Sequence, residues 1–155
     1  MDEIVGEVLG SVSRDRIVLM TKFGIRWDLE KGSFFLNTND NDGNALSVYK
    51  YSSAESIVYE CEQSLRRLKT DYIDLYQIHW PDITTSIEES MITCDKLVQS
   101  GKVRVVGVSN YSAAQMAEAE KVLCIASNQV PYSMINRDIE NEVVPYCIEN
   151  NVGIL

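Results

Sequence analysis

The sequence predicts an α/β protein of the closed (β/α)8 barrel type, and three observations support this. Apolar segments typical of strands alternate with helical segments along the chain, which implies parallel strands joined by helical crossovers. No glycine-rich phosphate loop of the Rossmann or Walker type follows any of these strands, which weakens the alternative of an open, doubly wound sheet. Four of the strands end in polar or charged residues, as strands do at the rim of a barrel that carries an active site.

The first part of the chain holds a helix, a strand and a long irregular segment. Residues 3–10 carry an apolar stripe and end in glycine, which predicts a helix. The β-branched run at 17–21 predicts a strand with Lys22 at its end. Residues 25–52 show no long period, and the stretch at 37–44, which is rich in asparagine and aspartate, predicts a loop.

The middle of the chain holds a helix and the clearest strand. Ser52 and Glu55 have the spacing of a capping box, and apolar residues then recur every three or four positions. Residues 73–78 form a nearly continuous apolar run, as in a strand covered on both faces. His79 follows this run, and Pro81 cannot donate to a strand ladder. We therefore expect a buried strand that presents His79 at its C-terminal edge.

The second half continues the alternation with short connections. Thr85 and Glu88 repeat the capping-box spacing before a helix that Gly101 ends, and Ser112 begins the next helix. Pro145 fits only within the first turn of the last helix. The expected helices cover residues 3–10, 52–68, 85–101, 112–123 and 141–150. The expected strands cover residues 17–21, 73–78, 103–108, 125–130 and 152–155.

Composition limits the class of protein. With 155 residues, 45% of them apolar and 24% charged, residues 1–155 are expected to form a single domain. A net charge of −9 opposes binding to nucleic acid or to an anionic lipid surface. The chain contains no apolar run long enough to span a membrane, and its first ten residues do not resemble a secretion signal. We therefore expect a cytoplasmic protein with neither nucleic acid nor membrane as a partner.

Three of the four cysteines are expected to be buried thiols. They are far apart, contain no CxxC pair, and have only one histidine to help them hold a metal, so no metal site is expected. Disulfides are not expected in a reducing compartment. Three of the four lie on apolar helical stripes, where a thiol behaves as a small hydrophobic group. The four are Cys61, Cys94, Cys124 and Cys147.

Side chains that could take part in catalysis lie at four strand ends. They are Lys22, His79, the pair Ser109 and Asn110, and Gln129. Each alone has a simpler explanation: a solvated lysine, a core histidine, a turn with a cap, and a glutamine that bonds the backbone. Parallel strands bring all of them to one rim, however, and their joint occurrence favours an active site.

Several stretches of the sequence resemble a known family. They are RDRIVLMTKFG, SLRRLKTDYIDLYQIHWPD, GKVRVVGVSNYS, and NQVPYS together with IENEVVPYCIENNVGIL. In this order the chain resembles the aldo-keto reductases, specifically the bacterial and plant branch related to potassium-channel β subunits. The resemblance implies a (β/α)8 barrel that uses NADPH, or less often NADH, to reduce small-molecule aldehydes and ketones in the cytosol.

The resemblance also implies roles for the residues at the strand ends. The family uses a tetrad of Asp, Tyr, Lys and His, and the last two members match Lys22 and His79. The matching Ser109, Asn110 and Gln129 would hold the nicotinamide carboxamide. Hydride addition builds negative charge on the carbonyl oxygen, so an acid and fixed donors are needed there. Lys22 would lower the pKa of the tyrosine, and His79 would orient the carbonyl oxygen.

The chain matches only the middle of the family's barrel, about five of eight β/α units. Family members carry the Asp and Tyr of the tetrad upstream of the first helix, so the chain alone is expected to be inactive. The strands at 17–22 and 152–155 would have open edges, through which copies could associate. A cofactor-binding regulatory subunit and a Lys/His isomerase on the same barrel are the alternatives. Trp27 and Trp80 have two interpretations, the border of a carbonyl pocket or plain packing.

Overall fold

The structure is a computed structural model that describes residues 2–155. Five strands form one parallel sheet whose spatial order follows the chain. They are β1 (Met20–Phe23), β5 (Ile73–Ile78), β6 (Val103–Ser109), β7 (Ser127–Gln129) and β8 (Gly153–Ile154). This is the order of consecutive units in a (β/α)8 barrel, so the predicted fold class, a partial barrel, is confirmed. The edge strands are β1 and β8, and association through them stays a prediction.

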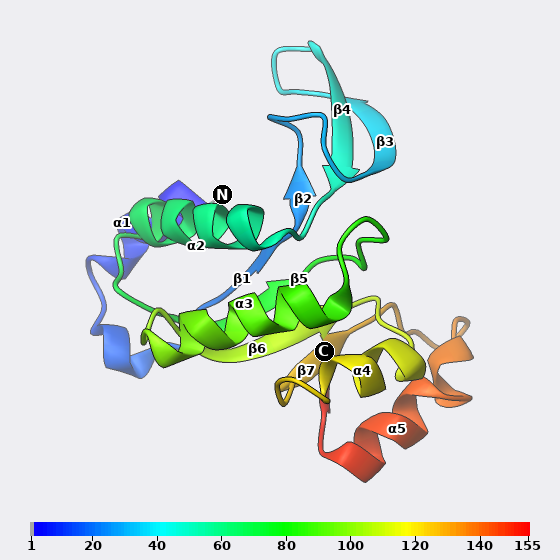
Figure 1. Cartoon of the computed structure of the whole chain (residues 1–155). Helices are drawn as coiled ribbons and strands as arrows, with labels where there is room; N and C mark the ends of the chain where they lie inside the picture. The colour runs from blue at the N-terminus through cyan, green and yellow to red at the C-terminus, as the bar shows by residue number, and fades with distance from the viewer. Residues whose placement is uncertain (1) are drawn as a thin grey trace.

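The helices pack against one another in chain order around the sheet (Figure 1). They are α1 (Asp2–Leu9), α2 (Ala54–Leu68), α3 (Ile87–Gln99), α4 (Ala113–Ala119) and α5 (Val143–Asn150), with short 3-10 turns at Arg14–Arg16 and Asp138–Glu140. Pro145 lies in the first turn of α5, as predicted. None of the helices within residues 2–155 is both long and apolar enough to cross a bilayer.

The main core lies between the sheet and the helices. Phe23 of β1 stacks on Tyr76 of β5 with ring centroids 4.2 Å apart, and both side chains are buried. Full burial of each such side chain contributes about 1.5–3 kcal/mol relative to exposure. Cys61, Cys94 and Cys147 lie buried in the helix layer, as their positions on apolar stripes predicted, whereas Cys124 is exposed.

The prediction of a loop at 25–52 is wrong. These residues form an antiparallel sheet of β2 (Ile25–Arg26), β3 (Ser33–Asn39) and β4 (Ala45–Lys50), in the order β2-β4-β3. Residues 27–32 between β2 and β3 are irregular, and the tip between β3 and β4 is a turn in which Asp40 accepts hydrogen bonds from the backbone N–H groups of Asp42 and Asn44. The sheet extends away from the barrel (Figure 1). Most of β3 is exposed, so its sequence lacks the apolar alternation that marks a half-buried strand.

Two predicted helix caps are wrong by one residue, and both residues predicted as caps are hydrogen-bonded to one buried carboxylate. Asp82 Oδ2 accepts hydrogen bonds from the Ser52 backbone N–H and from the Thr85 hydroxyl, at 2.9 Å each. In each case the next residue caps the helix. Ser53 accepts from the Ser56 N–H, and Ser86 accepts from the Glu89 N–H.

Other helix and strand boundaries also differ from the predicted ones. β1 begins at Met20 rather than residue 17, and residues 17–19 connect it to a 3-10 turn at Arg14–Arg16. Lys22 therefore lies within the strand rather than just after it. The helix that Ser112 caps ends at Ala119, four residues earlier than predicted, and β7 and β8 are shorter than the predicted strands.

Candidate active site

The strand register places Lys22, Ser109 and Gln129 on one face of the parallel sheet. Lys22 pairs with Gln77, Gln77 pairs with Gly107, and Ser109 pairs with Gln129. Residues paired across parallel strands point to the same face, and that face alternates along each strand. Phe23 and Tyr76 occupy the alternate positions, and their side chains face the helices. The side chains of Lys22, Ser109 and Gln129 therefore face the other side of the sheet, which is the interior of a barrel.

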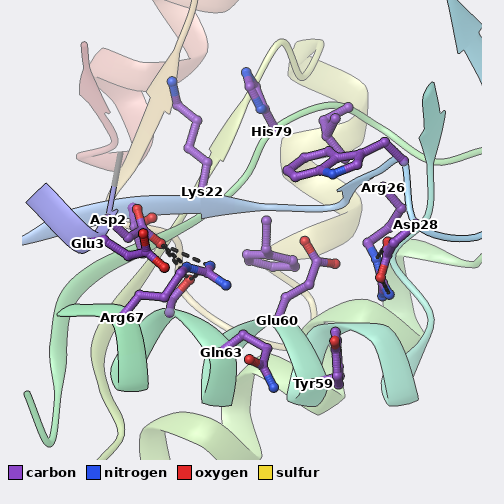
Figure 2. Close-up of a pocket in the computed structure, with 15 residues that line it drawn as sticks. Asp2, Glu3, Lys22, Arg26, Asp28, Tyr59, Glu60, Gln63, Arg67 and His79 are labelled. Carbon is purple, nitrogen blue, oxygen red and sulfur yellow. Dashed lines mark hydrogen bonds and ion pairs between the residues drawn. The ribbon is translucent and has the colours of Figure 1, made fainter. Parts of the chain in front are cut away.

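Lys22 and His79 line the same cavity, which has a volume of about 600 Å³. The His79 backbone N–H donates to the Phe23 carbonyl at 2.9 Å, which fixes the end of β5 beside the end of β1. Figure 2 shows both side chains on one side of the β1 ribbon, whereas Glu60 and Tyr59 of α2 lie on the other side. Within residues 2–155, Lys22 forms no ion pair.

The position of His79 determines its protonation. Burial lowers the pKa of its imidazole below the usual 6.5, and the nearby positive charge of Lys22 lowers this pKa further. The ring is therefore neutral at pH 7 and offers one N–H donor and one acceptor nitrogen. A neutral imidazole beside an ammonium group is suited to bind an oxygen atom on which negative charge develops.

Asn110 connects the ends of three strands. Its Nδ2 donates to the His79 carbonyl at 3.1 Å and to Ser109 Oγ at 3.0 Å. Its backbone N–H donates to the Gln129 carbonyl at 3.0 Å, and Ser109 Oγ donates to the same carbonyl at 2.8 Å. Asn110 has φ +61°, in the left-handed region that asparagine tolerates better than most residues. The turn after β6 is therefore fixed to β5 and to β7.

Two amide groups at this rim keep unused hydrogen-bonding capacity. Gln129 Oε1 accepts from Gln77 Nε2 at 3.4 Å, but its Nε2 makes no hydrogen bond within residues 2–155. Asn110 Oδ1 makes none there either. One free donor and one free acceptor complement the two ends of a carboxamide group, so the residues present fit a nicotinamide carboxamide.

Comparison with known proteins gives the family. The family model described as Aldo/keto reductase family matches residues 2–155. The chain belongs to the aldo/keto reductase family. Among curated proteins, it is 36% identical to the aldo-keto reductase YhdN of Bacillus subtilis over 99% of this chain and 42% of that protein. It is 37% identical to the NADH-specific methylglyoxal reductase of Escherichia coli over 97% of this chain and 45% of that protein.

Solved structures agree with this assignment. The glycerol dehydrogenase AKR11B4 from Gluconobacter oxydans aligns with a TM-score of 0.86 and 38% identity, over 99% of this chain and 43% of that one. A thermostable aldo-keto reductase aligns with a TM-score of 0.80 and 25% identity, over 99% of this chain and 48% of that one. This aldo/keto reductase chain thus spans a little under half the length of its relatives.

The structure also shows two supporting residues that the sequence analysis did not single out. Asn128 of β7 is fully buried, and its amide accepts from the Tyr111 N–H at 3.4 Å and donates to the Tyr111 carbonyl at 2.8 Å. Asp82 joins the His79 loop to the start of α2. The sequence did offer a signal for Asn128: it is a polar residue in a short strand that is expected to be buried. A buried amide group needs a hydrogen-bond partner.

The two tryptophans of this aldo/keto reductase chain differ in their surroundings. Trp27 is 60% exposed and lines the cavity that contains Lys22 and His79, so it borders the candidate site. Trp80 packs against Phe35 of β3 with ring centroids 5.5 Å apart. The antiparallel sheet therefore contacts the residue that directly follows His79.

Proposed function

We propose that the protein is an oxidoreductase that reduces small aldehydes and ketones to alcohols, with NADPH as the cofactor and NADH as the alternative. The observation that supports this best is that Lys22 and His79 line one cavity, while Asn110 is bonded to the His79 carbonyl and to Gln129. Family membership supports the reaction class. The name of the Escherichia coli relative supports NADH as the alternative.

The proposed chemistry assigns each of these residues a task. The nicotinamide cofactor, when bound, supplies hydride to the carbonyl carbon. The neutral imidazole of His79 donates its N–H to the carbonyl oxygen, and the ammonium of Lys22 stabilises the negative charge that develops there. Asn110 and Gln129 bind the carboxamide and so determine which face of the ring meets the substrate.

We also propose that the chain of 155 residues alone does not turn over. The reaction needs a proton donor at the carbonyl oxygen, and the tetrad of the family supplies a tyrosine. Of the tyrosines within residues 2–155, Tyr59 lines the cavity. It belongs to α2, on the opposite side of β1 from Lys22 and His79 (Figure 2). Tyr59 is thus poorly placed to donate to an oxygen held by His79.

NADPH oxidation with a generic aldehyde tests the proposal. The protein expressed from the complete reading frame should turn over, and Lys22→Met should lower kcat/KM by about 100-fold or more. Lys121→Met, a change of an exposed lysine after α4, is the matched control and should have no effect. Residues 1–155 alone should show no activity, and turnover by them that Lys22→Met abolishes would refute the proposed inactivity.

Binding of NADPH to the complete protein separates the alternatives. Asn110→Ala and Gln129→Ala should each weaken binding by about 5- to 10-fold, the equivalent of one hydrogen bond. Cofactor binding without turnover of any aldehyde would favour a regulatory subunit. Absence of all nicotinamide binding would favour a Lys/His isomerase instead.

A further inference from the structure

One peptide group joins the strand ends that carry Lys22 and His79. The carbonyl of Phe23, the last residue of β1, accepts from the His79 backbone N–H at 2.9 Å. The N–H of the same peptide group belongs to Gly24 and donates to Glu60 Oε2 of α2 at 3.0 Å. Because a trans peptide group is planar, its C=O and N–H point in opposite directions. The Glu60 carboxylate, this peptide group and the His79 N–H therefore form one chain of hydrogen bonds.

Glu60 is held in place on the helix side of β1. It lines the same cavity as Lys22 and His79, but Figure 2 shows it on the opposite side of the β1 ribbon from both of them. Its Oε1 accepts from the Ser56 hydroxyl at 3.0 Å, and Ser56 Oγ accepts from the Arg26 guanidinium at 2.6 Å. Both carboxylate oxygens are thus bonded, and Glu60 is connected to the candidate site through the backbone of β1.

The burial of this carboxylate costs stability. Burial raises the pKa of Glu60 from 4.5 to about 7, which is more than its hydrogen bonds and the charge of Arg26 lower it. The folded protein therefore loses stability as the pH rises through 7 and Glu60 ionises. Groups with strongly shifted pKa values cluster at functional sites. Glu60 is thus a side chain whose presence stability alone does not explain.

The peptide group that Glu60 binds sets the geometry of the site. Lys22 directly precedes this group in the chain, and the His79 backbone is bonded to it. Hydrogen bonds in a chain strengthen one another, because an acceptor on the N–H makes the carbonyl of the same peptide a better acceptor. Loss of the Glu60 carboxylate should therefore loosen the bond to His79 as well as its own bond.

We infer that Glu60 is a positioning residue that holds the Phe23–Gly24 peptide group. It thereby fixes the spacing between the side chains of Lys22 and His79, and it acts through the backbone rather than by touching the reacting atoms. This inference rests on the proposed reductase function, because it concerns the geometry of the same site. If Glu60 only supports the packing of α2, its removal will have no selective effect on kcat.

Steady-state kinetics on the protein expressed from the complete reading frame tests the inference. Glu60→Ala should lower kcat by about 10-fold. The Kd for NADPH should stay at the wild-type value, because the proposed cofactor-binding residues lie at the ends of β6 and β7. Glu60→Gln keeps an oxygen that can accept from the Gly24 N–H and should retain most of kcat. Glu62→Ala is the matched control, since this carboxylate of the same helix binds Lys102 instead, and it should leave kcat unchanged.

Amide hydrogen exchange gives a second measurement that does not depend on turnover. In Glu60→Ala the N–H groups of Gly24 and His79 should both exchange faster, by about 5-fold or more. In Glu60→Gln both should exchange as in wild type.

Four results would overturn the inference: an unchanged kcat in Glu60→Ala, an equal loss of kcat and of NADPH affinity, a Glu60→Gln variant as slow as Glu60→Ala, or faster exchange at Gly24 alone. Absence of turnover by wild type with every aldehyde would instead overturn the proposed function. Hydrogen exchange would then still decide whether Glu60 holds the two strand ends together.

Discussion

Replacement of Asn128 by alanine should destabilise the protein strongly, because its side chain is fully buried and is bonded to the turn after β6. The substitution removes the acceptor for the Tyr111 N–H at 3.4 Å and the donor to the Tyr111 carbonyl at 2.8 Å. Each lost hydrogen bond that leaves a buried partner unsatisfied costs about 1–3 kcal/mol. The longer bond is the weaker of the two, so the expected loss is about 2–4 kcal/mol in the free energy of unfolding.

Urea unfolding followed by far-UV circular dichroism measures this loss. With a slope of about 2 kcal/mol per molar urea, the midpoint for Asn128→Ala should fall by about 1–2 M at an unchanged slope. Asn150→Ala is the matched control, since Asn150 also donates to a backbone carbonyl, that of Tyr146 at 2.9 Å, but is exposed. Its stability should change by about 0.5 kcal/mol or less. A loss below about 0.5 kcal/mol for Asn128→Ala would refute the role given to this amide.

Three further predictions concern packing, pH and thiol reactivity. Gly6→Ala should cost about 1–3 kcal/mol in urea unfolding, because its Cβ would lie 2.2 Å from the Arg67 carbonyl where α1 meets α2. Burial raises the pKa of Glu60 from 4.5 to about 7 in the folded protein. The folded state therefore holds this proton more tightly, and the free energy of unfolding should fall by about 2 kcal/mol as the pH rises from 5 to 8. In Glu60→Gln the urea midpoint should depend less on pH. The same pH dependence of the midpoint in wild type and Glu60→Gln would contradict this prediction. A thiol reagent should modify Cys124 in the native protein and the three buried cysteines only after unfolding, whereas rapid labelling of all four thiols would contradict the packing of the helix layer.

Local sequence patterns determined the alternation of strands and helices and the residues at the strand ends. The run at 73–78 predicted β5 with the correct bounds, because a strand buried on both faces is mostly apolar. Its two buried polar residues, Asp74 and Gln77, are hydrogen-bonded. Ser112 predicted its helix cap correctly, since the capping box with Gln115 involves residues only three positions apart. Lys22, His79, Ser109, Asn110 and Gln129 were placed on one rim by the direction of parallel strands alone, and the register agrees with that placement. Their roles in catalysis and cofactor binding stay predictions.

Long-range contacts decided the rest, because no local pattern records them. The strands β3 and β4 pair with each other, and most of β3 is exposed, so the sequence at 25–52 did not predict them. Asp82, which binds both of the residues predicted as helix caps, lies 30 residues from Ser52 in the sequence. The partner of Asn128, Tyr111, also comes from another segment. The sequence by itself therefore determined which residues stand at the ends of the strands, and the tertiary structure decided what surrounds them, since burial and partners depend on how distant segments pack.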